Sequence, residues 1–116
     1  MDKTAKKIVI NISILIILIL VVYFGFIYVP NGTLNVNLVQ CISEKSELYV
    51  QQGCPACDRQ EKLFGEFISH LNIIDCSKDF KICSDNFITH TPTWIINDEK
   101  YQGYQSMEKL KELTGC

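Results

Sequence analysis

Hydrophobic and polar residues divide the chain into one long apolar segment and a more mixed remainder. No charged residue occurs between Ile8 and Val29, where Ile, Leu and Val dominate. At about 1.5 Å per residue, a helix of this length spans roughly 33 Å, which is enough to cross the hydrocarbon core of a bilayer. The pattern therefore predicts a transmembrane helix over residues 8–29, preceded by a short basic N-terminus over residues 1–7.

The charges before this apolar segment predict its orientation. Lys3, Lys6 and Lys7 precede it. Positively charged flanks stay on the cytoplasmic side, so we expect the N-terminus to be cytoplasmic and the rest of the chain to be extracytoplasmic. A cleaved signal peptide is the alternative, but such peptides have a shorter apolar region and a small-x-small cleavage site, which residues 27–30 lack. We therefore predict an uncleaved signal anchor.

Beyond the apolar segment, the pattern predicts a linker and one small α/β domain. Residues 30–46 contain no long periodic run, and we interpret them as the linker. Residues 47–116 alternate apolar runs with helix-like segments in the order β-α-β-α-β-β-α, which predicts a single sheet with helices on its faces. The expected elements are a strand over 48–50, a helix over 55–70, a strand over 72–76, a short helix around 83–87, strands over 91–96 and 100–103, and a last helix that is capped by Ser106 and ends at Gly115.

Charge and cysteine content narrow the classes of function. The net charge is −2 and no basic stripe with interleaved aromatic residues occurs, so we expect no nucleic-acid partner. Six cysteines in 116 residues are typical of an oxidising compartment, in which disulfides stabilise a small core. The cysteine content therefore agrees with the extracytoplasmic location that the lysines predict.

The most informative motif is the Cys-x-x-Cys pair formed by Cys54 and Cys57, between the first strand and the first helix of the domain. Pro55 suits the first helical position, where a missing N–H is harmless, and this makes Cys54 the N-cap. Its sulfur then lies among the unpaired N–H groups of the first turn, at the positive end of the helix dipole. A thiolate is stabilised there, and the thiolate is the species that attacks disulfides. We therefore predict a redox-active pair with Cys54 as the nucleophile.

Zinc binding is the alternative interpretation of this motif. A structural zinc site needs two further ligands at short spacing. The sequence has no second Cys-x-x-Cys, and its two histidines, His70 and His90, are not paired at ligand spacing. We therefore expect neither a metal nor an organic cofactor.

The other four cysteines have different expected roles. Cys76 and Cys83 flank a short polar loop between a strand end and a helix start. Because closing this loop needs little rearrangement, we predict a structural disulfide between them. Cys41 lies in the expected linker as a free or structurally paired thiol, and the pairing of Cys41 and Cys116 stays open at the level of sequence.

The order of elements and motifs resembles the thioredoxin fold, and in particular the thioredoxin-like domain that is fused to bacterial vitamin K epoxide reductase homologues. The resemblance covers residues 47–116. It rests on Cys54-Pro-Ala-Cys57, on Leu63-Phe64 in the following helix, on the pair Cys76 and Cys83, on Pro92-Thr-Trp-Ile-Ile-Asn97 and on the closing Gly115-Cys116. It implies that Pro92 is cis and lies opposite the Cys pair, where the backbone of Thr91 pairs with an extended substrate.

Two positions depart from thioredoxin itself. Leu48 stands six residues before the first active-site cysteine, where thioredoxin has a buried Asp that serves as a proton acceptor. Gly53 stands directly before that cysteine, where thioredoxin has Trp. The absence of this proton-accepting Asp disfavours a function as a general disulfide reductant. It is weaker evidence against a function as an oxidant.

These features predict a membrane-anchored, extracytoplasmic thiol–disulfide oxidoreductase that acts on substrate proteins with thiols or disulfides. The resembling family carries a fused four-helix quinone-reducing domain, whereas this chain offers one span. The resemblance therefore implies a separate membrane quinone reductase, similar to vitamin K epoxide reductase, that reoxidises the Cys pair. The direction of electron flow stays open in the sequence. A tethered disulfide reductase or isomerase, and a non-catalytic peptide-binding adaptor that uses the groove at Pro92, are the alternatives.

Overall fold

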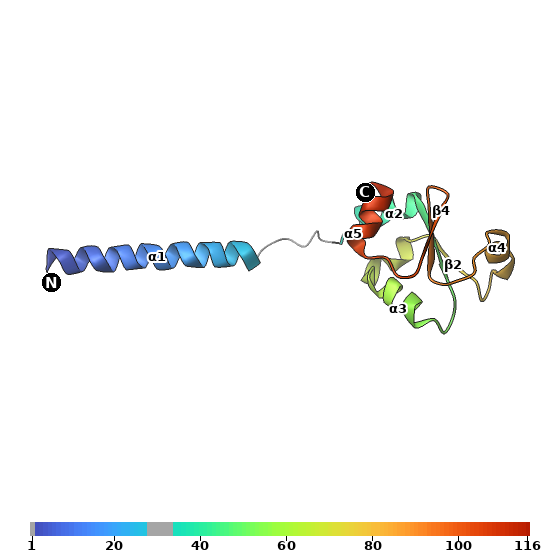
Figure 1. The fold of residues 1–116 in the computed structure, drawn as a ribbon, viewed down its shortest axis with the longest axis horizontal. Helices are drawn as coiled ribbons and strands as arrows, with labels where there is room; N and C mark the ends of the chain where they lie inside the picture. Colours follow the sequence, from blue (N-terminus) through green and yellow to red (C-terminus); the bar gives the residue numbers. More distant parts are fainter. Residues whose placement is uncertain (1, 28–33) are drawn as a thin grey trace. The chain divides into compact units, whose positions relative to one another are not determined.

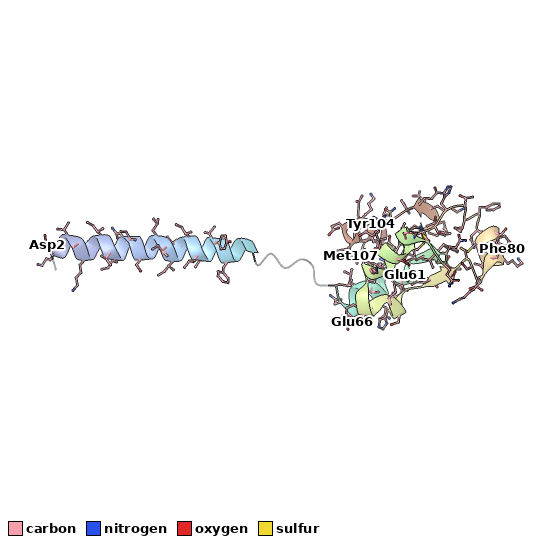
Figure 2. All side chains as sticks on the ribbon, turned by 90° about the horizontal axis from the view of Figure 1, so that it is seen from below. Asp2, Glu61, Glu66, Phe80, Tyr104 and Met107 are labelled. Carbon is pink, nitrogen blue, oxygen red and sulfur yellow. A yellow bond between two sulfur atoms is a disulfide. The ribbon has the colours of Figure 1, made fainter. Side chains whose placement is uncertain are left out.

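The computed structural model describes residues 2–27 and 34–116, and the chain divides into two compact units, Met1–Thr33 and Leu34–Cys116 (Figure 1). In the first unit, helix α1 spans Lys3–Ile27. The side chains drawn in Figure 2 stand outward around the helix, and its large apolar residues from Ile8 to Phe24 are exposed. The segment Lys3–Gly25 is long and apolar enough to cross a membrane, a criterion that a signal sequence near an N-terminus also meets. The last two residues of the predicted span, 28 and 29, lie outside the described residues.

The second unit is built around a mixed four-stranded sheet with the strand order β2-β1-β3-β4. Strand β1 pairs in parallel with β2 and antiparallel with β3, and β3 pairs antiparallel with β4. The strands are β1 (Ser46–Val50), β2 (Ile73–Asp75), β3 (Thr93–Ile96) and β4 (Glu99–Gln102). The helices are α2 (Val36–Glu44), α3 (Pro55–Lys62), the 3₁₀ helix η1 (Gly65–His70), α4 (Phe80–Asp85) and α5 (Met107–Thr114). This arrangement confirms the predicted α/β thioredoxin fold.

Helix α2 lies where we expected a linker. The side chain of Asn35 accepts a hydrogen bond from the N–H of Leu38 at 2.9 Å and so caps the helix. Val39 and Ile42 are fully buried against the rest of the unit. The physical reason for the difference is that these residues form one apolar helix face, which is too short to produce a periodic signal but has a core to pack on. The compact unit therefore begins at Leu34 rather than at Glu47.

The helix that we expected over residues 55–70 is interrupted. Helix α3 ends at Lys62, and η1 begins at Gly65. Gly65 has a φ of +52°, which is left-handed backbone that a residue with a side chain rarely adopts. Phe64 lies at this interruption, and its side chain is fully buried.

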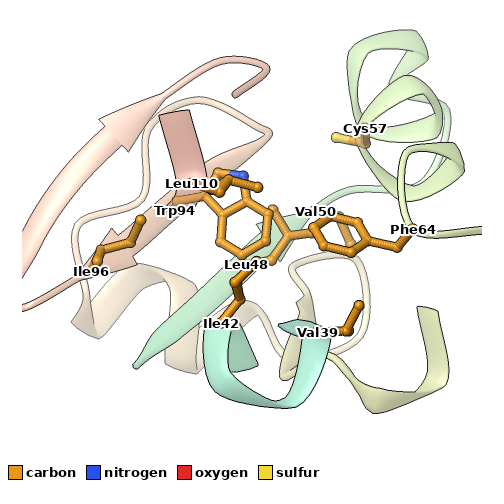
Figure 3. Close-up of a cluster of buried hydrophobic side chains, with 9 residues drawn as sticks. All are labelled: Val39, Ile42, Leu48, Val50, Cys57, Phe64, Trp94, Ile96 and Leu110. Carbon is orange, nitrogen blue, oxygen red and sulfur yellow. The ribbon is translucent and has the colours of Figure 1, made fainter. Parts of the chain in front are cut away.

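The core lies on one face of the sheet. Because successive strand residues point to opposite faces, Leu48 and Val50 of β1 share this face with Trp94 and Ile96 of β3. The helices that cover the face supply the remaining side chains of the cluster. Its members are Val39, Ile42, Leu48, Val50, Cys57, Phe64, Trp94, Ile96 and Leu110 (Figure 3). One active-site sulfur, that of Cys57, therefore belongs to the apolar core.

Local turn and cap chemistry positions the last elements. Asn97 and Asp98 join β3 to β4 with φ values of +52° and +65°, as a tight hairpin turn requires. The hydroxyl of Ser106 accepts a hydrogen bond from the N–H of Lys109 at 3.2 Å, and Gly115 is the left-handed C-cap of α5. Both predicted ends of the last helix are therefore confirmed.

Candidate active site

The Cys54–Cys57 disulfide lies at the start of α3. Cys54 is the N-cap residue with extended backbone, and Pro55 is the first helical residue. The backbone N–H of Cys57 donates a hydrogen bond to the sulfur of Cys54 at 3.2 Å. The sulfur of Cys54 therefore occupies the predicted position among the first N–H groups of the helix.

A glycine turn brings the chain from β1 to this helix. Gly53 has a φ of +77°, and a Cβ built there would meet no atom within 4 Å. The requirement for glycine is thus conformational rather than a matter of space, since left-handed backbone strains residues that carry a side chain. A tryptophan at this position, as in thioredoxin, would not suit the observed backbone.

The two sulfurs have different surroundings. Cys57 is only 1% exposed and packs in the core, whereas Cys54 is half-buried at the surface. Cys57 belongs to the cluster of nine buried apolar side chains, and Leu48 is another member of it. Glu47 points to the other face of β1, where it accepts a hydrogen bond from the Tyr49 hydroxyl at 2.6 Å. Burial, together with this hydrogen bond, raises the pKa of Tyr49, so its hydroxyl stays protonated.

The segment that leads into β3 lies directly beside the Cys pair. The Thr91–Pro92 peptide bond is cis, the geometry that the resemblance implied. The carbonyl oxygen of Thr91 is 3.5 Å from the sulfur of Cys54. Two further hydrogen bonds hold this segment: the Thr93 hydroxyl donates to the His90 carbonyl at 2.6 Å, and the Gly103 N–H donates to the Pro92 carbonyl at 2.7 Å. The structure thus brings Thr91 and Pro92 together with Cys54, while their role in binding substrate stays a prediction.

Gln60 is a residue of the site that the sequence analysis did not single out. It lies one turn after Cys57 on α3 and is fully buried. Its amide nitrogen donates to the carbonyl of Gln105 at 3.1 Å, and its amide oxygen accepts the N–H of Gln105 at 2.7 Å. Gln60 therefore ties the active-site helix to the connection between β4 and α5. The sequence did contain a signal for the burial of Gln60. Its spacing from Cys57 and Phe64 places all three residues on one face of a helix.

The second cysteine pair lies near the Cys54 site but is separate from it. A disulfide joins Cys76, after β2, to Cys83 in α4, with the two Cα atoms 5.7 Å apart. Cys83 is buried, whereas Cys76 is partly exposed. Both residues line a groove that reaches Thr91. The structure thus has the expected pair, and its purely structural role stays a prediction.

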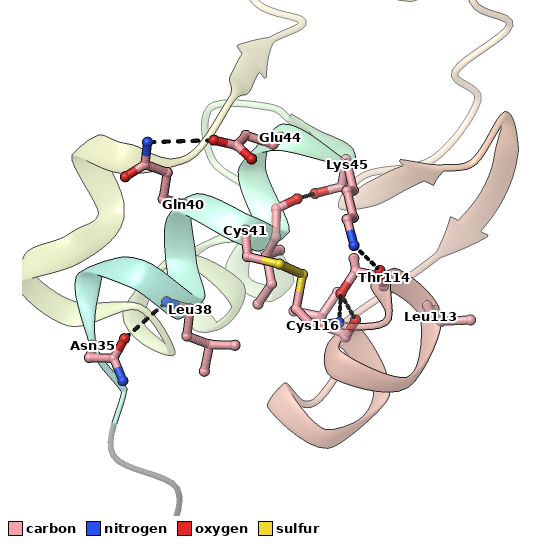
Figure 4. Close-up of a disulfide and its surroundings, with 12 residues drawn as sticks. Asn35, Leu38, Gln40, Cys41, Glu44, Lys45, Leu113, Thr114 and Cys116 are labelled. Carbon is pink, nitrogen blue, oxygen red and sulfur yellow. Dashed lines mark hydrogen bonds between the residues drawn. A yellow bond between two sulfur atoms is a disulfide. The ribbon is translucent and has the colours of Figure 1, made fainter.

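The third pair links the two ends of the unit. Cys41 in α2 and Cys116 at the end of the chain form a disulfide across a sequence separation of 75 residues (Figure 4). Beside it, the Lys45 ammonium donates a hydrogen bond to the Thr114 carbonyl at 3.0 Å. The position that we expected in a linker is therefore anchored to the last helix.

Comparison with known proteins finds two similar curated proteins, including a plant thiol-disulfide oxidoreductase, and several partly similar solved structures. No family model matches the chain. The thiol-disulfide oxidoreductase LTO1 of Arabidopsis thaliana is 34% identical over 79 residues, which covers 60% of this chain and 21% of the plant protein. The chain thus spans about a fifth of the length of that relative.

The solved structures that are partly similar to this chain include the following two. The NTD_N/C domain of the alkylhydroperoxide reductase AhpF from Enterococcus faecalis has a TM-score of 0.45 and 17% identity, over 72% of this chain and 45% of that chain. The glutaredoxin grx-1 from Archaeoglobus fulgidus has a TM-score of 0.42 and 23% identity, over 72% of this chain and 97% of that chain.

Proposed function

We propose that this chain is a membrane-anchored thiol–disulfide oxidoreductase that exchanges disulfides with substrate proteins through Cys54 and Cys57. The observation that carries the proposal is the asymmetry of the pair. Cys54 is accessible and receives a backbone N–H at 3.2 Å, whereas Cys57 is 1% exposed. Only Cys54 can therefore meet a second protein. The similarity to a plant thiol-disulfide oxidoreductase supports the same chemistry.

In the oxidising direction, the reaction begins at the sulfur of Cys54. A substrate thiolate attacks this sulfur, the Cys54–Cys57 bond breaks, and its electron pair leaves on Cys57, which takes up a proton. A second substrate thiol then loses its proton and attacks the substrate sulfur of the mixed disulfide, which releases Cys54 as a thiolate. Counted from the dithiol, the substrate loses two electrons and two protons. The Cys pair gains the two electrons, Cys57 takes up one proton, and the other proton goes to solvent.

The surroundings of the two sulfurs favour this direction. The N-terminal N–H groups of α3 stabilise the thiolate of Cys54, which makes it a good leaving group. The reverse reaction needs Cys57 to attack from the core, where the apolar side chain of Leu48 stands at the position of the Asp that accepts the proton in thioredoxin. This observation ranks the tethered reductase or isomerase below the oxidant. Thr91 and Pro92 bind the substrate backbone in this proposal, and the Cys76–Cys83 disulfide is structural.

The anchor in this proposal is the apolar helix. Residues 8–29 cross the membrane, residues 1–7 stay in the cytoplasm, and the domain that begins at Leu34 is extracytoplasmic. The lysines in the first turns of α1 and the disulfides of the domain support this topology. A separate membrane quinone reductase similar to vitamin K epoxide reductase reoxidises the Cys pair.

The test is a trapping experiment with the full chain in its host membrane. We expect Cys57→Ser to accumulate mixed disulfides at Cys54, seen as adducts that a reductant removes, because the second cysteine no longer competes for the bond. Cys54→Ser is the matched control and should give none. A membrane-impermeant thiol reagent should label Cys54 of the reduced protein in intact cells. Adducts in the Cys54→Ser variant would contradict the roles assigned to the two cysteines. Labelling only after lysis would contradict the extracytoplasmic location of the domain. Binding of client peptides by both variants without adducts would favour an adaptor.

A further inference from the structure

Trp94 carries a polar group that the fold leaves without a partner. The residue is fully buried on β3 and belongs to the apolar core cluster (Figure 3). Among the residues that the structure describes, its indole nitrogen is the one buried side-chain nitrogen or oxygen without a hydrogen-bond partner. Other buried polar side chains are paired, since the Thr93 hydroxyl donates to the His90 carbonyl at 2.6 Å and the Gln60 amide donates to the Gln105 carbonyl at 3.1 Å. A buried unpaired donor is unfavourable and calls for a physical explanation.

Two contacts place the indole of Trp94 beside the active-site pair. The carbonyl of Thr91, three residues before Trp94, is 3.5 Å from the sulfur of Cys54. The indole itself packs on the ring of Phe64, with the ring centroids 6.0 Å apart. Cys57 lies between Cys54 and Phe64 along the chain, and its side chain extends from α3 into the core (Figure 3). The unpaired N–H therefore lies in the part of the core that holds the sulfur of Cys57.

The sulfur of Cys57 changes chemically during the reaction. In the oxidised form it is bonded to the sulfur of Cys54, and this bond fixes its position. Reduction frees the Cys57 side chain to rotate about its Cα–Cβ bond and leaves a negative charge on the sulfur until a proton arrives. Cys57 is 1% exposed, so water solvates this charge little. Because hydrogen bonds to a charged acceptor are roughly twice as strong as neutral ones, a buried donor gains most by binding this sulfur.

We propose that the indole N–H of Trp94 donates a hydrogen bond to the sulfur of Cys57 when the active-site pair is reduced. The oxidised form keeps an unpaired buried donor, whereas the reduced form pairs it. This difference favours the reduced form and so makes the disulfide a stronger oxidant. The inference rests on the proposed function, and it adds a residue that sets the reduction potential of the pair.

The donor acts at the moment when the disulfide breaks. A substrate thiolate attacks the sulfur of Cys54, the bond between the two active-site sulfurs breaks, and its electron pair moves to the sulfur of Cys57. The indole N–H stabilises this charge and keeps its own proton. Such a donor is effective because the fold holds it in place before the charge develops. The sulfur of Cys57 then takes up a proton from solvent, and as a thiol it still accepts a weaker hydrogen bond.

The first measurement observes the indole N–H directly. The chain has one tryptophan, so a proton–nitrogen correlation spectrum of the full chain in detergent contains one indole signal. We expect reduction with dithiothreitol to move this signal downfield and to slow its exchange with solvent. The matched controls are two variants that each keep one active-site thiol. Cys54→Ala retains the proposed acceptor and should give the signal of the reduced protein, whereas Cys57→Ala lacks the acceptor and should not.

The second measurement tests the effect on the reduction potential. Replacement of Trp94 by benzothienylalanine keeps the shape of the ring system and exchanges its N–H for sulfur. The redox state of the pair in glutathione buffers is measured by alkylation and mass spectrometry. We expect the equilibrium constant for reduction of the pair to fall about ten-fold, which corresponds to ~30 mV. Ile96→Val is the matched control, because it loosens the same core on the same strand and leaves the indole intact, so it should not change this constant.

The outcomes separate this inference from the proposed function. An indole signal that stays in place on reduction, or that moves equally in Cys57→Ala, would overturn the hydrogen bond and leave the oxidoreductase intact. An unchanged constant in the benzothienylalanine variant, or an equal fall in Ile96→Val, would overturn the role of the N–H in setting the potential. Failure of the wild-type pair to exchange with glutathione and dithiothreitol would overturn the proposed function, and this inference with it.

Discussion

Removal of the Cys41–Cys116 disulfide should destabilise the domain more than removal of the Cys76–Cys83 disulfide. The double variant Cys41→Ala/Cys116→Ala deletes a link between α2 and the chain end. Both residues are partly exposed, so the substitution removes little core packing. The hydrogen bond from Lys45 to Thr114 and the buried face of α2 remain in the variant. The native fold should therefore persist, and the effect should arise in the unfolded chain.

The size of the effect follows from the length of chain that each disulfide closes. In the chain-entropy model, a separation of 75 residues corresponds to about 4.5 kcal/mol at 25 °C. A separation of 7 residues, as for Cys76 and Cys83, corresponds to about 2.4 kcal/mol. With a urea m-value of ~1.5 kcal/mol per M, these losses lower the unfolding midpoint by about 3 M and ~1.6 M.

The assay uses the one tryptophan of the chain as its probe. Trp94 is fully buried in the core of the second unit, so its fluorescence reports unfolding of this unit and not of α1. Urea titrations of the oxidised full chain in detergent, for the wild type and both double variants, give the midpoints. Near-ultraviolet circular dichroism without urea checks that the folded state is unchanged.

Two results would refute this reasoning. A loss for Cys41→Ala/Cys116→Ala that does not exceed the loss for Cys76→Ala/Cys83→Ala would show that loop length does not govern the effect. An altered circular dichroism spectrum without urea would show that the disulfide holds α2 in place in the folded state. In that case the explanation through the unfolded chain would be wrong.

Three further predictions follow from the site and from the true start of the domain. In the reduced protein, Cys54 should alkylate faster than Cys57, and its pKa should lie below the reference thiol value of about 8.5, because it lies at the surface at a helix N-terminus. Mass spectrometry of the alkylated residue over a pH series measures both the rate and the pKa. Faster labelling of Cys57 would reverse the two roles. Gln60→Ala should lower the free energy of unfolding by about 1–3 kcal/mol, since it leaves the part-buried N–H and carbonyl of Gln105 without their partner. A change below ~0.5 kcal/mol in urea titrations would show that water replaces the amide. A fragment that starts at Leu34 should fold and exchange disulfides with small thiols. A fragment that starts at Glu47 should unfold at a lower urea concentration because it lacks α2. Equal unfolding midpoints would contradict the contribution of α2 to the core.

Features that depend on neighbouring residues could be predicted from the sequence. Cys54 as an N-cap followed by Pro55, and Ser106 and Gly115 at the ends of the last helix, each follow from the chemistry of one helix end. The order of strands and helices follows from the spacing of apolar runs. These signals are contained in a few consecutive residues, so no tertiary contact was needed to interpret them.

Features that depend on distant contacts could not be predicted in the same way. Helix α2 is stable because Val39 and Ile42 pack on a core formed by later segments, which a nine-residue pattern does not reveal. The pairing of Cys41 with Cys116 likewise depends on where the last helix ends in space. The interruption at Gly65 was missed for another reason, because the apolar period continues through it and favours an unbroken helix.

The contrast between the two active-site sulfurs connects the fold to the direction of electron flow. Strand β1 places Leu48 in the cluster that surrounds Cys57, and it directs its carboxylate, Glu47, to the opposite face. The reduced form therefore keeps Cys57 as a buried thiol, while Cys54 at the helix end is stabilised as a thiolate. A pair of this kind releases a substrate easily after accepting its electrons and attacks a new disulfide slowly. The same apolar core that stabilises the domain thus supports the oxidising direction in the proposed function, in which a second protein oxidises the pair again.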